Sequence, residues 1–377
     1  SYYIYIYILY TMNINKSSTL ESMGIIEDRR NNKQQVFNGG LGENPFPLIQ
    51  QIQQYLTMYS NKKEYTRPNG IAPLREIISK NSSNNKYKVD DVIIGNGLKE
   101  LLFILLLVLN QLDFYLFLIT PCWVSYIEHS KIIKMNTIFV KTNHKDNYKI
   151  DIDCIKKHFE KYHDKNKVIL FNNPVNPTGV VYTIEEVEKL SLLFKEYNVL
   201  VISDEIYNNL VYSIYKTASV SNYYSNVIIG NSLSKNFSAG GWRLGWLTFP
   251  NRLKHIYELV YNYSSCIYSC ASTPLQYAAT HILKYEKPIV NYINTMCNFF
   301  HQLSEYCYDR FIHMNLLVSK PQAAWYIFID FKNYKDRFFS RNIITSNDLV
   351  NSLIEGIGLV TISGDNFGYD KLTIRYS

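Results

Sequence analysis

This 377-residue chain lacks three features, and each absence excludes a class of protein. Its longest apolar run, residues 101–109, is about half of the roughly 20 residues that cross a bilayer, so no membrane partner is expected. No block of five or six like charges occurs despite a net charge of +7, which argues against a nucleic-acid partner. The six cysteines show neither a Cys-x-x-Cys pair nor metal-ligand spacing, which indicates free thiols, no metal and a cytoplasmic location.

The chain does contain enough apolar sequence for a large core, since 47% of its residues are hydrophobic and 19% are charged. Short apolar segments alternate with helix-length segments, which is the pattern of an α/β fold. We expect strands at 92–94, 114–119, 168–171, 199–202 and 227–229, and helices at 98–110 and 183–197. Residues 315–331 and 358–376 are predicted to be strands of a second, smaller domain, with a boundary near 270–290.

Polar residues gather just past the ends of three of these strands, at 172–174, 203–205 and 231–235. In open α/β sheets, ligands bind outside the carboxyl ends of the strands. Polar clusters at successive strand ends would therefore converge on one site. This convergence indicates an enzyme.

Two of the clusters present single groups with a recognisable use. Two prolines and a glycine make segment 173–179 a rigid turn that could hold the Asn176 amide in one orientation; an ordinary loop is the alternative. Asp204 follows four apolar residues, where a carboxylate needs a partner or its pKa rises. A cationic heterocycle nitrogen would be one such partner, with Tyr207 close by; a cap or turn residue is the alternative.

A further group of residues suits a phosphate beside an amine nucleophile. Ser232, Ser234, Lys235 and Arg243 combine hydroxyls, an amine and a guanidinium, and a desolvated lysine near other cations becomes a usable amine. Residues 95–97 precede a helix whose first amides could bind phosphate. A surface loop is the alternative for each segment. Arg375 could bind a carboxylate bidentately or simply lie at the surface.

Taken together and in this order, these segments resemble the class I/II aminotransferases, the aspartate aminotransferase-like enzymes of fold type I that use pyridoxal 5'-phosphate (PLP). The resemblance covers residues 36–377. Its most specific parts are Asn-Pro-x-Asn-Pro-Thr-Gly, Asp-Glu-x-Tyr, Ser-x-Ser-Lys and Gly-Trp-Arg-x-Gly, at 173–179, 204–207, 232–235 and 241–245. Segments 42–47, 65–75 and 120–126 also match.

The resemblance implies catalytic roles at three matching positions. Lys235 would hold PLP as a Schiff base and shuttle the proton at the substrate Cα. Asp204 would pair with the protonated pyridine nitrogen and keep the ring an electron sink. Tyr207, together with Asn176, would hydrogen-bond the phenolate oxygen of PLP.

The remaining implied roles concern binding. Ser232, Ser234 and Arg243 would hold the phosphate, with the amides of Leu98 and Lys99. Tyr65 would reach the phosphate of the neighbouring subunit, so a homodimer is implied. Trp123 would stack near the ring, and Arg375 would clamp the substrate carboxylate, with Gly42, Trp123 and Asn176 also lining the substrate site.

The family implies a mostly parallel mixed sheet in a large PLP-binding domain, residues 36–275, whose first part also contributes to the small domain. Residues 276–377 would form the smaller α/β C-terminal domain, truncated at its end because the family usually continues beyond Arg375. Residues 1–35 are expected to be an N-terminal extension, either disordered or non-native. Ala323 stands where the family has glycine, which could narrow the pocket or shift the turn.

The expected activity is transfer of an amino group between an L-amino acid and a 2-oxo acid, by a ping-pong mechanism, in amino-acid metabolism and biosynthesis. Segment 266–273 offers no Arg or Lys for a second substrate carboxylate, which weakens a strict aspartate or glutamate preference. The alternatives are a PLP-dependent β-lyase on the same fold, an inactive homologue acting as a binding or structural dimer, and a phosphate-binding α/β protein.

Overall fold

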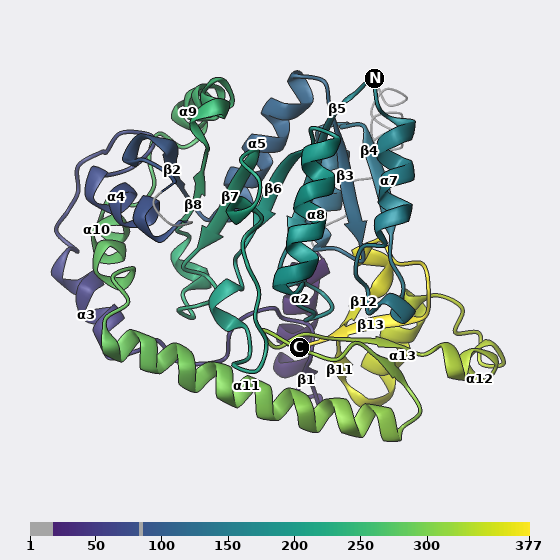
Figure 1. The fold of residues 1–377 in the computed structure, drawn as a ribbon. Helices are drawn as coiled ribbons and strands as arrows, with labels where there is room; N and C mark the ends of the chain where they lie inside the picture. Colours follow the sequence, from purple (N-terminus) through teal and green to yellow (C-terminus); the bar gives the residue numbers. More distant parts are fainter. Residues whose placement is uncertain (1–17, 83–85) are drawn as a thin grey trace, which may run out of the picture.

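A central sheet organises the molecule. The computed structural model describes residues 18–82 and 86–377, and within them seven strands form one sheet (Figure 1). Only the second strand in the sheet order runs antiparallel to its neighbours. The order is β2 (Val92–Gly95), β8 (Gly245–Thr248), β7 (Val227–Ser232), β6 (Leu200–Asp204), β5 (Asn166–Asn172), β3 (Phe114–Thr120) and β4 (Thr137–Lys141).

Helices cover both faces of this sheet, and the alternation of side chains along the strands decides which face each residue joins. Leu116 and Leu118 of β3 pack with one core cluster, which contains residues of α5 (Leu98–Gln111), α6 (Val124–Ile132) and α9 (Lys254–Ile267). Phe117 lies between them and packs with the opposite cluster, which contains residues of α7 (Ile152–Lys161) and α8 (Ile184–Glu196). Strands buried on both faces read as continuous apolar runs, which is why they were predictable.

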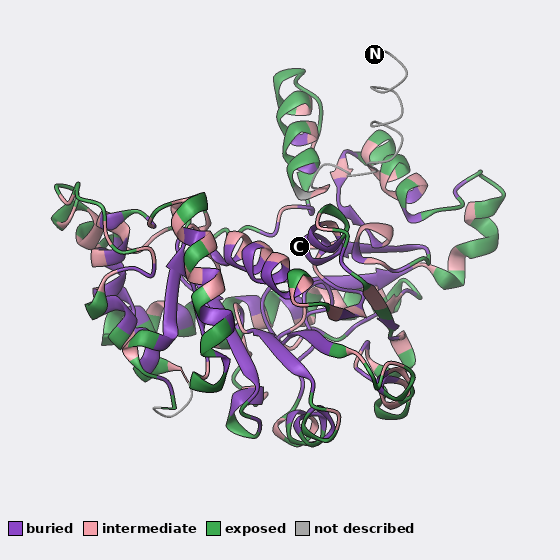
Figure 2. Cartoon of the chain, turned by 90° about the horizontal axis from the view of Figure 1, so that it is seen from above, coloured by how far each residue is buried: buried purple, intermediate pink, exposed green. Residues whose placement is uncertain are grey.

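The predicted strands and helices of this part are confirmed, with bounds that differ by a few residues. Helix α8 begins after a capping box in which Thr183 and Glu186 exchange hydrogen bonds. Strands β4 and β8 were not predicted. Figure 2 shows the central strands buried and the outward helix surfaces exposed.

A second, smaller sheet lies near the C-terminus. Among the described residues it contains four antiparallel strands in the order β12 (Ile362–Ser363), β13 (Thr373–Tyr376), β10 (Ile327–Asp330) and β9 (Leu317–Val318). The segments predicted as long strands, 315–331 and 358–376, are therefore short strands separated by loops. Helix α13 (Ser346–Ile357) and the short α12 (Lys335–Phe339) accompany this sheet, and the long α11 (Lys287–His313) leads to it (Figure 1).

The N-terminal part of the described chain contributes to both regions. Strand β1 (Phe37–Asn38) pairs in parallel with β11 (Leu359–Val360), beside the small sheet. Helices α3 (Gln50–Met58) and α4 (Ala72–Asn81) contact α10 (Thr273–Ile282) near the β2 edge of the large sheet. The division at residues 275 and 276 stays a prediction.

One expectation about the N-terminal extension needs correction. Disorder was one of the two alternatives for residues 1–35, but α2 (Ser18–Asn31) is a regular helix. Residues 1–17, the first part of this predicted extension, lie outside the described residues. No helix in the described part is both long and apolar enough to span a bilayer.

Candidate active site

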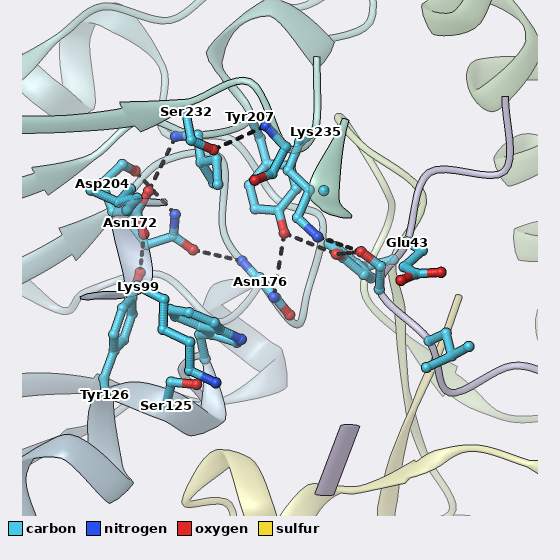
Figure 3. A pocket seen from close by; sticks show the side chains of 18 of the residues that line it. Glu43, Lys99, Ser125, Tyr126, Asn172, Asn176, Asp204, Tyr207, Ser232 and Lys235 are labelled. Atoms are coloured by element: carbon cyan, nitrogen blue, oxygen red, sulfur yellow. Dashed lines mark hydrogen bonds between the residues drawn. The ribbon is translucent and has the colours of Figure 1, made fainter. Parts of the chain in front are cut away.

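A cavity of about 250 Å³ lies beside the carboxyl ends of β5, β6 and β7. It brings together all but one of the predicted site residues, although they come from distant parts of the chain. Figure 3 shows Lys99, Asn176, Asp204, Tyr207, Ser232 and Lys235 among them. Those that line the cavity are Gly42, Leu98, Lys99, Trp123, Asn176, Asp204, Tyr207, Ser232, Ser234, Lys235, Arg243 and Arg375. Tyr65 is the exception, because it is 89% exposed in the loop between α3 and α4.

Asp204 is a buried carboxylate at the last position of β6. The Tyr126 hydroxyl donates to its Oδ2 at 2.5 Å, and the backbone N–H of Ile206 donates to Oδ1 at 3.1 Å. Burial raises the pKa of Asp204 to about 6, although these hydrogen bonds and the charge of Lys235 act to lower it. No ion pair joins Asp204 to a cation of the described chain, so its charge would be compensated by a cationic ligand group.

Lys235 follows β7 and extends into the cavity (Figure 3). Its ammonium donates a hydrogen bond to the backbone carbonyl of Gly42 and lies 5.8 Å from the centre of the Trp325 ring. This hydrogen bond to a backbone carbonyl is not an ion pair, so the Lys235 amine remains available for covalent attachment of a ligand. The side chain that sequence reasoning expected to be a nucleophile therefore lies in the same cavity as Asp204.

Asn176 and Tyr207 form a hydrogen-bonded unit in the same cavity. The backbone N–H of Asn176 donates to Asn172 Oδ1 at 2.8 Å, which fixes the rigid turn after β5. The Asn176 Nδ2 donates to the Tyr207 hydroxyl at 3.5 Å, and that hydroxyl lies 2.8 Å from the hydroxyl of Tyr326. These groups can present hydrogen-bond donors to an anionic ligand oxygen.

The end of the cavity that suits a phosphate lies between the N-terminus of α5 and Arg243, and its shape requires two glycines. A Cβ added to Gly97 would lie 2.4 Å from Nη2 of Arg243, and one added to Gly245 would lie 2.3 Å from the backbone nitrogen of Leu98. The absence of these side chains lets the N-terminus of α5 and the guanidinium of Arg243 approach each other. Arg243 donates only to backbone carbonyls, at Gly240 (2.8 Å) and Asn96 (3.3 Å), among the residues that the structure describes. Ser232, which pairs with Gly245 across β7 and β8, lines the cavity, as does Ser234.

Arg375 is a fully buried cation on β13, with 2% of its surface exposed. Its Nη1 donates to Asn176 Oδ1 at 3.1 Å, and its Nη2 donates to the Gly40 carbonyl at 2.6 Å. Burial lowers the pKa of the guanidinium, and within the described ranges no carboxylate pairs with it. A buried charge without a partner is costly, so this position suits the carboxylate of a ligand.

The match to known proteins agrees with this geometry. Residues 36–377 match the family model for aminotransferase class I and II. The chain belongs to the class I and II aminotransferases.

Two groups of relatives extend the match. An aspartate aminotransferase of Bacillus sp. (strain YM-2) is 30% identical over 353 residues, which cover 91% of this chain and 86% of the relative. The solved structure of aspartate aminotransferase from Thermotoga maritima has a TM-score of 0.83 and 26% identity, and covers 97% of this chain and 92% of that one. Aspartate aminotransferase from Thermus thermophilus with maleate shares the fold, with a TM-score of 0.86, 21% identity and coverage of 97% and 92%.

This aminotransferase is therefore a PLP-dependent enzyme that moves an amino group between an amino acid and a 2-oxo acid. The relatives do not favour the β-lyase or the inactive dimer. The residues present fit PLP, because the cavity combines a buried anion for a ring nitrogen, an available amine, and a cationic cradle at a helix N-terminus. When bound, the cofactor supplies an electron-accepting ring that stabilises negative charge at the substrate Cα.

Three parts of the site escaped sequence reasoning. Tyr126 and Tyr326 were given no role, although Tyr126 lies in the matching segment 120–126 of a sequence with 33 tyrosines. The side chain of Lys99 lines the cavity, whereas only its amide was expected to do so. Helix α2 also contributes Leu20 and Met23 to the cavity lining. Ala323, which could narrow the pocket or shift the turn, does not line the cavity.

Proposed function

We propose that this aminotransferase prefers substrates with two carboxylates, such as aspartate and its 2-oxo acid. The observation that carries the proposal is that the cavity holds Lys99 besides Arg375 and the two cations assigned to the cofactor, Lys235 and Arg243. Lys99 lines the same cavity, and within the described chain it forms no ion pair with a carboxylate. Arg375 suits the α-carboxylate and Lys99 the distal carboxylate.

The surroundings of Lys99 support this use. Its ammonium lies 5.6 Å from the centre of the Trp123 ring, and Figure 3 places the side chain beside Ser125, away from Ser232. Burial and the nearby charge of Arg243 lower the pKa of Lys99. A desolvated ammonium near a second cation gains from a carboxylate partner. Segment 266–273 was expected to weaken a dicarboxylate preference, but Lys99 provides the cation that this segment lacks.

The names of the relatives agree with the proposal. The Bacillus and Thermotoga relatives are aspartate aminotransferases, and the Thermus structure contains maleate, a dicarboxylate. Aspartate carries the two carboxylates that Arg375 and Lys99 would bind.

For the other residues we propose the roles that the family resemblance implies, and their place in the cavity lining supports these roles. Lys235 would hold the cofactor and move the proton at the substrate Cα, and Asp204 would hold a proton on the ring nitrogen. Tyr207 and Asn176 would orient the phenolate oxygen of the cofactor. Ser232, Ser234, Arg243 and the amides of Leu98 and Lys99 would bind its phosphate, while Trp123 and Gly42 would bound the ring and the substrate.

We also propose a homodimer in the cytoplasm. Tyr65 is 89% exposed and cannot serve its own cavity, so its expected role requires the phosphate of a second subunit. The six cysteines are free thiols, as is usual in a reducing compartment. Sedimentation of the PLP-loaded protein should give a dimer, and a monomer with full activity would contradict the role of Tyr65.

The substrate preference can be tested with Lys99→Met, which keeps the length of the side chain and removes its charge. We expect the KM for aspartate to rise about 10- to 100-fold, because a charge-assisted contact is lost. The KM for alanine, which has no distal carboxylate, should change less than about threefold. Steady-state kinetics with both amino acids would measure this difference.

Lys131→Met is the matched control, because Lys131 lies on α6 and pairs with Glu128 outside the cavity. It should leave both KM values unchanged. An equal loss for aspartate and alanine in Lys99→Met would contradict the proposal. A wild-type protein whose absorbance does not respond to any amino acid after addition of PLP would contradict the assigned site itself.

A further inference from the structure

Tyr326 links three of the proposed site groups, although no role has been assigned to it. It is 1% exposed, and its hydroxyl lies 2.8 Å from that of Tyr207. The same hydroxyl lies 3.4 Å from the carbonyl of Gly42, which also accepts a hydrogen bond from Lys235. The Arg375 guanidinium lies over the Tyr326 ring, with Cζ 4.7 Å from its centre.

We propose that Tyr326 is a positioning residue whose hydroxyl strengthens the hydrogen bond from Tyr207 to the phenolate oxygen of the cofactor, and so controls protonation of the linkage between Lys235 and the cofactor. This inference rests on the proposed roles of Tyr207 and Lys235. The role proposed for Tyr326, which lines the same cavity, acts through Tyr207.

Counting the hydroxyl protons supports this inference. Tyr207 has one proton, and when it donates that proton to a ligand oxygen its own oxygen must accept from its neighbours. Two neighbours can donate to it, the Asn176 amide at 3.5 Å and the Tyr326 hydroxyl at 2.8 Å, and Tyr326 must be the donor of that pair once Tyr207 gives its proton to the ligand. Because hydrogen bonds in a chain polarise one another, a donor to Tyr207 makes its proton a stronger donor to the ligand.

The position of Tyr326 is tightly restrained. A Cβ added to Gly42 would lie 2.8 Å from the Tyr326 hydroxyl oxygen, and one added to Gly179 would lie 2.6 Å from its backbone carbonyl oxygen. The rings of Tyr207 and Tyr326 meet edge to face, with centroids 5.5 Å apart. These contacts hold the Tyr326 hydroxyl near two acceptors, the Tyr207 hydroxyl at 2.8 Å and the Gly42 carbonyl at 3.4 Å, and the shorter contact is with Tyr207.

The consequence concerns the linkage to Lys235. A hydrogen bond to the phenolate stabilises the anionic oxygen after the linkage has lost its proton more than it stabilises a neutral oxygen. Weakening that hydrogen bond therefore makes the linkage keep its proton to a higher pH. The change is visible as a pH titration of the cofactor absorbance and needs no measurement of turnover.

The test uses Tyr326→Phe, which removes the hydroxyl but keeps the ring beneath Arg375. In the PLP-loaded protein, the midpoint of the absorbance titration should rise by about 0.5–1 pH unit. The KM for the amino acid should change less than about threefold, because the contact with Arg375 remains. Tyr326→Leu should raise the midpoint equally and also raise the KM.

Two further variants separate positioning from a general packing effect. Tyr257→Phe removes another buried hydroxyl, which accepts from Asn69 at 2.9 Å outside the cavity, and should leave the midpoint unchanged. In the Tyr207→Phe background, Tyr326→Phe should shift the midpoint little further, because the coupling acts through Tyr207.

If Tyr326→Phe and Tyr326→Leu both titrate with the midpoint of the wild-type protein, this inference is overturned and the proposed function stays intact. An equal shift from Tyr326→Phe with and without Tyr207 would also overturn it. If the wild-type protein shows no cofactor band at all, the proposed function fails first. The Leu variant keeps the test decisive if the Phe variant does not fold.

Discussion

The two buried charges of the cavity, Asp204 and Arg375, have opposite signs and the same deficiency. Asp204 lies at the end of β6 in the large sheet and receives hydrogen bonds from Tyr126 and a backbone N–H. Arg375 lies on β13 of the small sheet and donates to Asn176 and a backbone carbonyl. Neither forms an ion pair within the described chain. Buried charges in proteins are usually paired with an opposite charge, so both are unusual in this respect.

The comparison shows how the fold reserves charge for its ligands. The large sheet holds an anion that suits a cationic ring nitrogen, while the small sheet holds a cation that suits a carboxylate. Each charge has hydrogen bonds that fix its orientation without neutralising it. We therefore expect Asp204 to act mainly on the cofactor and Arg375 mainly on the substrate.

Lys235→Ala should have the largest effect, because this residue would both attach the cofactor and move the proton at the substrate Cα. Loss of a positioned proton-transfer group costs about 10²–10⁴-fold in turnover, and loss of the covalent attachment adds to this. Single-turnover measurements with PLP and aspartate would quantify the loss. A circular dichroism spectrum should show intact folding. Turnover at the wild-type rate would refute the role assigned to Lys235.

Arg375→Ala should weaken substrate binding by about 2–3 kcal/mol, or roughly 30- to 150-fold in KM, because a bidentate charge-assisted contact is lost. Arg375→Lys keeps the charge but loses the planar fork, so it should recover only part of the affinity. Affinity for PLP should stay near that of the wild type, as a fluorescence titration would show. If PLP affinity falls as much as substrate affinity, the division of roles is wrong.

Asp204→Asn should change how the stability of the PLP-free protein depends on pH. The folded-state pKa of Asp204, about 6, is above its usual value of 3.8, so its favourable contribution is present at low pH and is lost as the pH rises from about 4 through 6. We expect a loss on the order of 2 kcal/mol over this window in the wild type and not in Asp204→Asn. Urea unfolding at several pH values would measure it.

Addition of PLP should reverse this trend in the wild type, because a cationic ring nitrogen favours the charged carboxylate. Asp204→Asn should lose most of that stabilisation. Parallel pH profiles of unfolding for the two PLP-free proteins would show that Asp204 does not carry the buried charge.

The main strands could be predicted because each is a short apolar run ending in polar residues. Segment 168–171 predicted β5, and the turn after it placed Asn176 correctly in the cavity. Strand β8 was missed because it is only four residues long, begins with Gly245 and Trp246, and follows a glycine-rich segment that resembles a loop. The small-sheet strands were overextended, since two-residue strands leave no recognisable pattern.

The sequence by itself determined the α/β class, the order of the segments and the residue types at the strand ends, because apolar periodicity and turn residues act over a few positions. Only the tertiary structure decided which side chains meet. Arg375 reaches the carbonyl of Gly40 across 335 positions, and Lys235 reaches that of Gly42 across 193. Tyr126, Tyr326 and the Lys99 side chain became recognisable only through such contacts, since burial and hydrogen bonding depend on elements that are distant in the chain.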